Sequence, residues 1–141
     1  MSEHIVKAYG EELAQLSAEI ARLGGLVESQ IASAVDSMTR RDVAQATAVV
    51  KNDEQIDALQ LEVEDKVLRM FALRQPMAVD LRHVMSAMKI SMQLERCGDL
   101  AKNIAKRGLV LAKGEPVTPF NRSIDRMGKL VGERLKAVLD A

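Results

Sequence analysis

Carboxylates spaced four residues apart are the feature of this sequence with the clearest chemical potential. Glu95 and Asp99 form one such pair, and Asp53 and Asp57 form a second. Residues four apart share one face of a helix, so each pair would bring two negative charges together. A cation, a proton or basic side chains must then offset the repulsion. Because all these ligand atoms are oxygens, they predict a site for hard cations such as Mg²⁺, Mn²⁺ or iron.

The alternative to metal binding is ordinary ion pairing on a solvated, charged helix face. Arg82, Arg96 and Lys102 are near enough in the sequence to the later carboxylate pair to serve as partners. Gly98 lies between the two carboxylates of that pair, and it has no side chain, so a ligand or another helix would be able to approach closely. The residues alone leave both interpretations open.

Several other kinds of site are disfavoured by what the sequence contains. Neither histidine, His4 or His83, follows a glutamate at three residues, which disfavours a ferritin-like di-iron site. The sequence has no glycine-rich phosphate loop, no Gly-x-Ser-x-Gly elbow and no Cys-x-x-Cys motif. Cys97 is the single cysteine, so no internal disulfide forms, and we expect a packed, unreactive thiol in a reducing compartment.

Charge and composition narrow the class of protein further. The 141 residues carry 20 basic and 20 acidic side chains, and this balance argues against nucleic acid as a partner. No apolar run approaches the roughly 20 residues of a membrane span, and the N-terminal residues do not follow a signal-peptide pattern. We therefore expect a cytoplasmic protein whose association with membranes is at most indirect.

Four helices are predicted to position the carboxylates. Apolar residues recur at three and four positions throughout the chain, which is the helical period, and the strand period of two is absent. Asp42 is a plausible N-cap, and Pro76 favours the first turn of a new helix. The predicted helices span about 3–38, 42–73, 76–113 and 120–141, with a linker at 114–119. Long helices joined by short turns predict an all-α fold whose first three helices form an antiparallel bundle.

A weak internal repeat indicates how the fourth helix relates to the others. Residues 23–31 align with residues 127–135, 104 positions later, and Gly24 falls on Gly128. The repeat predicts a three-helix unit at 1–115, followed at 116–141 by a linker and the first helix of an incomplete second unit. A lone fourth helix leaves an apolar stripe in need of cover, so we also expect a homodimer.

Two longer motifs carry a resemblance to a known family. Residues 74–82 read Arg-Gln-Pro-Met-Ala-Val-Asp-Leu-Arg, and residues 94–99 read Leu-Glu-Arg-Cys-Gly-Asp. Together with Leu-Gly-Gly-Leu-Val-Glu at 23–28 and Asp-Glu-Gln-Ile-Asp at 53–57, they resemble the PhoU family of bacterial phosphate-signalling regulators. The similarity covers essentially the whole chain, although family members are longer.

The resemblance implies a fold of two tandem three-helix bundles and a regulatory, non-enzymatic function. PhoU-like proteins are thought to connect the ATPase subunit of a phosphate ABC transporter to a sensor histidine kinase, and to repress phosphate-starvation genes and uptake when phosphate is abundant. Some members bind metal through acidic motifs that correspond here to Glu95 with Asp99, and to Asp53 with Asp57. The alternatives are a carboxylate-bridged metal protein with a catalytic or storage role, and a purely structural bundle that dimerises.

Overall fold

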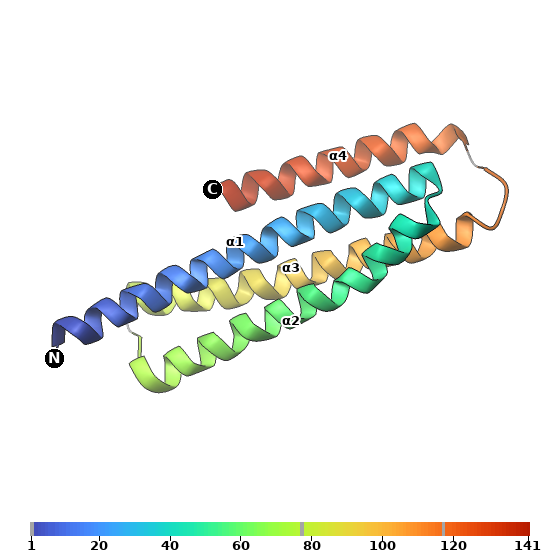
Figure 1. Cartoon of the computed structure of the whole chain (residues 1–141). Coiled ribbons are helices and arrows are strands. Elements are labelled where there is room, and N and C mark those ends of the chain that lie inside the picture. Colours follow the sequence, from blue (N-terminus) through green and yellow to red (C-terminus); the bar gives the residue numbers. More distant parts are fainter. Residues whose placement is uncertain (1, 77, 117) are drawn as a thin grey trace.

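The chain folds into four long α-helices, which the computed structural model describes over residues 2–76, 78–116 and 118–141. In order, these are α1 (Ser2–Arg40), α2 (Val43–Arg74), α3 (Ala78–Leu111) and α4 (Thr118–Asp140) (Figure 1). No strand occurs among the described residues. The predicted all-α fold is therefore confirmed, and most helix ends lie within two residues of their predicted positions.

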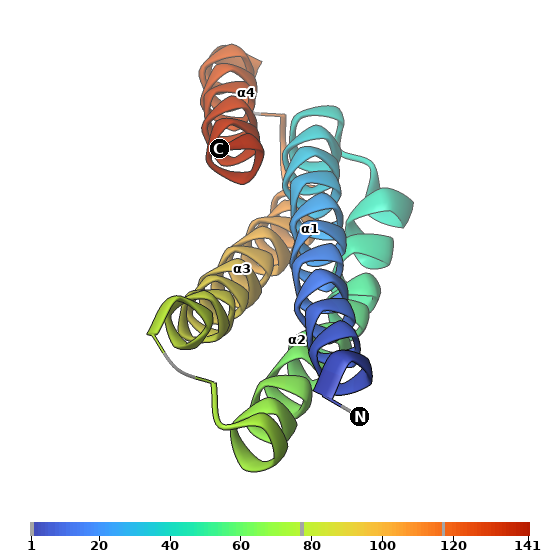
Figure 2. The same ribbon diagram turned by 90° about the vertical axis from the view of Figure 1, so that its left-hand side faces the viewer.

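Helices α1, α2 and α3 pack as an antiparallel bundle around a shared apolar core. Seen close to end-on, the three helices surround a common axis and α4 lies to one side of them (Figure 2). The apolar stripes predicted from the sequence face that axis, where mostly aliphatic side chains fill the space, and Tyr9 and Phe71 pack against its edge. The fully enclosed members of the core include Leu16, Leu23, Val27, Val49, Ile56, Val63, Val67 and Val84.

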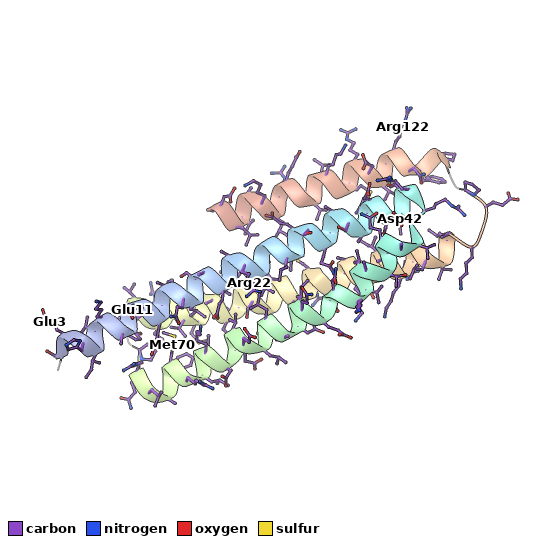
Figure 3. All side chains as sticks on the ribbon, in the orientation of Figure 1. Glu3, Glu11, Arg22, Asp42, Met70 and Arg122 are labelled. Atoms are coloured by element: carbon purple, nitrogen blue, oxygen red, sulfur yellow. The ribbon has the colours of Figure 1, made fainter. Side chains whose placement is uncertain are left out.

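The turn between α1 and α2 follows the predicted capping pattern. Asp42 precedes the first residue of α2, and its Oδ1 accepts a hydrogen bond from the backbone N–H of Gln45 at 3.0 Å (Figure 3). This bond satisfies one of the free N–H groups that every helix start exposes. The adjacent Arg41 donates to the carbonyl oxygens of Ala112 and Gly114, which ties this turn to the end of α3.

The turn between α2 and α3 differs from the prediction. The third helix begins at Ala78, two residues after the predicted start at Pro76, and Met77 lies outside the described residues. Gln75 and Ala78 both have left-handed backbones, with φ of 45° and 51°. Because left-handed residues interrupt a right-handed helix, α2 ends before Gln75 and α3 starts only at Ala78.

Helix α4 lies along α1, antiparallel to it, at two glycines. A Cβ atom placed on Gly24 would be 2.7 Å from Leu139 Cδ1, and one placed on Gly128 would be 2.7 Å from Val35 Cγ1. Among the described residues, α1 is the only helix with which α4 makes close backbone contact. Helix α4 also exposes apolar side chains that α1 does not cover, at Phe120, Met127, Leu130, Val131 and Val138.

Membrane insertion finds no support in the described helices. None of them combines the length with the apolar character that crossing a bilayer requires.

Candidate metal centre

The packing of α2 against α3 brings three of the predicted carboxylates together. One carboxylate oxygen each from Asp53, Asp57 and Asp99 lies within 4.8 Å of the other two. Asp53 and Asp57 come from α2 and Asp99 from α3, so the spacing within each helix and the pairing of the helices both contribute. An arrangement of oxygens on this scale matches what a single hard cation needs from its ligands.

Asp53 is the buried member of this cluster. Its side chain is 0% exposed, whereas Asp57 and Asp99 reach the surface. Lys102 Nζ, from α3, donates a hydrogen bond to Asp53 Oδ2 at 3.0 Å, while Asp53 Oδ1 is buried and has no hydrogen-bond partner among the described residues. The alternative of a solvated, charged helix face therefore does not describe Asp53.

The fourth predicted ligand, Glu95, lies beside the three aspartates. Burial, hydrogen bonding to Asp99 and the negative charges of Asp99, Asp57 and Asp53 together raise its pKa to about 7. Burial and the charges of Asp53 and Asp99 also raise the pKa of Asp57, while Lys102 opposes that shift. These shifts have one cause, which is that four acidic groups share a partly dehydrated site with a single ammonium group.

Gly98 sets how closely the two helices approach at the cluster. It is buried, and a Cβ atom at this position would lie 3.1 Å from Ile56 Cδ1 and 3.5 Å from Asp53 Oδ1. Ile56 is itself 0% exposed and fills the space that a larger residue at position 98 would take. The glycine singled out from the sequence therefore allows α2 to approach closely, and it places no side chain against the buried free oxygen of Asp53.

The remaining residues considered in the sequence are placed elsewhere. Cys97 is free and half-buried, and it lines an apolar groove of about 780 Å³ between α3 and α4, on a different face of α3 from the carboxylates. His83 is exposed, and its Nε2 lies 3.1 Å from the hydroxyl oxygen of Ser17. Arg82 is exposed, and Asp80 lies in the first turn of α3.

The sequence analysis did not predict which carboxylate Lys102 pairs with. Lys102 was one of three basic residues considered for pairing, but its bond to Asp53 on the neighbouring helix was not foreseen. A usable signal was present, because Lys102 follows Asp99 by three residues and so lies on the face of α3 that carries the carboxylates. Two further interhelical pairs, Lys66 with Glu19 and Arg74 with Glu12, were also not predicted.

Comparison with known proteins identifies the family. A model of the PhoU domain matches residues 20–108. The chain belongs to the PhoU family. A relative from Caulobacter vibrioides, named phosphate-specific transport system accessory protein PhoU homolog, is 60% identical over 141 residues, which cover 100% of this chain and 61% of that protein. A relative of the same name from Zymomonas mobilis is 42% identical, over 98% of this chain and 58% of that protein.

The PhoU fold is also evident from a solved structure. The crystal structure of PhoU from Pseudomonas aeruginosa superposes with a TM-score of 0.91 at 31% sequence identity, over 94% of this chain and 64% of that one. The chain thus spans about three fifths of the length of these PhoU relatives. The prediction of the family from the motifs at 74–82 and 94–99 is confirmed.

Proposed function

We propose that this chain is a non-enzymatic regulator of phosphate homeostasis in the cytoplasm. In this role it couples the ATPase subunit of a phosphate ABC transporter to a sensor histidine kinase, and it represses phosphate-starvation genes and uptake when phosphate is abundant. The observation that carries the proposal is the 60% identity, along the whole chain, to a protein named as an accessory of the phosphate-specific transport system. A rigid bundle of long helices suits a protein that works by contact with partners.

A complementation assay tests this function. A bacterium that lacks its own PhoU-family gene would express this chain and carry a reporter under a phosphate-starvation promoter, with a full-length relative as the positive control. We expect the chain to restore low reporter expression in phosphate-rich medium and to co-purify with the ATPase subunit and the kinase. Full reporter expression in that medium, with the chain present at the level of the positive control, would contradict the proposal.

The acidic cluster is proposed to bind a hard cation, Mg²⁺, Mn²⁺ or iron, through Asp53, Asp57, Asp99 and Glu95. The buried, unpartnered Asp53 Oδ1 supports this assignment, since such an oxygen is costly to bury without a donor or a cation. The donor set consists of oxygens alone, as these ions prefer. A bound ion would offset the negative charge and link α2 to α3.

Measurements of Mn²⁺ binding distinguish a specific metal site in this cluster from an ordinary charged surface. The variant carrying Asp53→Asn and Asp57→Asn is compared with a control carrying Glu62→Gln and Asp65→Asn, which removes two exposed acids from the same helix. We expect the first variant to lose binding of Mn²⁺ measured by calorimetry, and the control to keep it. Equal binding by both variants would assign the ion to non-specific surface charge. Metal binding combined with turnover of a phosphate ester or an oxidation would favour the catalytic alternative.

Residues 1–115 are proposed to form one PhoU-like repeat, and residues 116–141 the linker and first helix of a second, incomplete repeat. The contacts between α1 and α4 support this division. Gly24 contacts Leu139, and Gly128 contacts Val35. Gly128 lies 104 positions after Gly24, and Leu139 lies 104 positions after Val35, which is the offset of the sequence repeat. Limited proteolysis tests it: cleavage should concentrate at 112–119 and release a helical fragment of residues 1–115.

The exposed apolar side of α4 is the proposed contact for a homodimer of this chain. It presents Leu130, Val131 and Val138, which are 46%, 51% and 73% exposed. Sedimentation of the 141-residue chain should show a dimer, and Leu130→Glu with Val131→Glu should make it a monomer. A monomeric wild-type chain at tens of micromolar would remove this proposal.

A further inference from the structure

Lys102 contributes an ammonium group to the acidic cluster. Its Nζ is 3.0 Å from Asp53 Oδ2, and the charges of Asp57 and Asp99 act on the same ammonium group. The acceptor is 0% exposed, while the lysine side chain is 29% exposed and reaches the site from α3. The cluster therefore already has one positive charge, on a flexible arm that extends to solvent.

The pairing leaves Asp53 only half satisfied. Lys102 bonds one of its oxygens, and the other is buried without a partner among the described residues. A Cβ atom at position 98 would lie 3.5 Å from that free oxygen, and glycine places no side chain there. An unpaired buried acceptor costs stability. Glu19, which pairs with Lys66, also keeps one buried oxygen without a partner among the described residues, so a half-satisfied carboxylate alone does not mark a site. At Asp53, oxygens of Asp57 and Asp99 also lie within 4.8 Å, and this cluster together with the free oxygen points to a second ligand in addition to the lysine.

We infer that Lys102 is a built-in counter-ion that competes with the metal ion, so that the cluster exchanges between a lysine-bound and a metal-bound state. The inference rests on the proposed function of the cluster as a metal site. When a divalent ion binds Asp53, Asp57 and Asp99, the ammonium group moves outward into water, and its long aliphatic stem makes that movement inexpensive. When the ion leaves, Lys102 returns and prevents a buried carboxylate from remaining without a counter-charge.

The competition sets the affinity and selectivity of the site. An ion must displace an ammonium group as well as lose its own water, so monovalent ions, which bring no more charge than the lysine, are disfavoured. Without the lysine the same carboxylates would hold a divalent ion more tightly, because a like charge a few ångströms away weakens cation binding by at least about tenfold. Lys102 therefore keeps the metal exchangeable, as a regulator that responds to its surroundings requires.

The test compares Mn²⁺ affinity in four 141-residue proteins: wild type, Lys102→Gln, Lys102→Arg and Lys106→Gln. The first variant removes the ammonium charge and keeps a hydrogen-bond donor, and the second keeps the charge. The third removes an exposed charge one turn further along α3 and serves as the matched control. Free Mn²⁺ is measured by electron paramagnetic resonance, and circular dichroism at 222 nm verifies that each variant is helical.

We expect Lys102→Gln to bind Mn²⁺ at least about tenfold more tightly than wild type. Lys102→Arg should bind no more tightly than wild type, and Lys106→Gln should be unchanged. Equal or weaker Mn²⁺ binding by a helical Lys102→Gln protein, with binding by wild type intact, would overturn the inference and leave the metal site standing. Absence of binding in both proteins would refute the site and the inference together.

A second measurement follows Lys102 in the wild-type protein itself, and it uses the charge-retaining Lys102→Arg variant only for assignment. The carbon-13 signal of the Lys102 Cε group, assigned by its absence from the Lys102→Arg spectrum, is followed during titration with Mg²⁺. It should move toward the position of the exposed lysines as the ion displaces the ammonium group. A signal that stays in place at saturating Mg²⁺ would show that Lys102 remains bound, which contradicts the exchange.

Discussion

Two adjacent glycines in α1 offer a test of how α4 is held. Gly24 faces α4, where an added Cβ would lie 2.7 Å and 2.8 Å from the two Cδ atoms of Leu139, well inside contact distance. Gly25 has nothing within 4 Å of the same position. The two residues occupy the middle of one helix, so substitution by alanine improves the intrinsic helix propensity equally at both, by about 1 kcal/mol.

The expected effects differ because only one of the new methyl groups meets another side chain. Gly25→Ala should raise the free energy of unfolding by about 1 kcal/mol. Gly24→Ala gains the same propensity but forces the terminal methyl groups of Leu139 to shift, and because Leu139 is half-buried this overpacking costs about 1 kcal/mol, the lower end of the usual range. The two variants should therefore differ by about 1 kcal/mol, with Gly24→Ala close to wild type in stability.

Urea unfolding followed by circular dichroism at 222 nm measures both values, and an unchanged slope with urea verifies that the same structure unfolds. The clash should disappear when Leu139→Ala is added, so Gly24→Ala should stabilise that background by about 1 kcal/mol. Equal stabilisation by Gly24→Ala and Gly25→Ala in the wild-type background would refute the close contact between α1 and α4.

Three further predictions concern the pH dependence of stability, the turn after α1, and the glycines of α4, one of which packs against α1. The pKa of Glu95 rises from 4.5 to about 7 on folding, so the folded state binds the extra proton. The free energy of unfolding of the metal-free protein should therefore fall between pH 4.5 and 7, by at most about 1.4 kcal/mol per pH unit for this one proton, and Glu95→Gln should flatten this dependence in urea titrations. Asp42→Ala should lower the free energy of unfolding by about 1 kcal/mol in the same assay, since it removes the cap of α2. Gly128→Ala should destabilise the protein because its methyl group meets the stiff, β-branched Val35, whereas Gly132→Ala, with nothing within 4 Å, should stabilise it by about 1 kcal/mol.

The helices were predictable because their signals are local. Apolar residues at three- and four-residue intervals mark the buried face of each helix, and Asp42 marks a start through a hydrogen bond to a residue three positions away. The start of α3 was less predictable. Pro76 is compatible with a first helical turn, but left-handed backbones at Gln75 and Ala78 delay the helix, and neither residue type favours that conformation on its own.

The acidic cluster was predictable in its members but not in its electrostatics. The four-residue spacings put each pair of carboxylates on one face, and the antiparallel pairing of α2 with α3 was expected from the short turn between them. Which carboxylate becomes buried depends on how closely α2 and α3 approach each other, which is the depth of their contact. That depth is set by Ile56 against Gly98, two residues far apart in the sequence. The burial of Asp53 and its bond to Lys102 follow from this tertiary contact.

The two contacts between α1 and α4 carry more information than the alignment that first related these helices. Any pair of amphipathic helices shares apolar positions, and a single glycine at a crossing is common. Here Gly24 packs on Leu139, and Gly128 packs on Val35. The two contacts are equivalent under the repeat, because the glycine of one helix and the aliphatic residue of the other each change places at an offset of 104 positions. A surface that meets its own counterpart in this reciprocal way is what an approximate twofold axis produces. The seam between α1 and α4 is therefore self-complementary, which favours duplication of one helical unit over the chance docking of an unrelated helix.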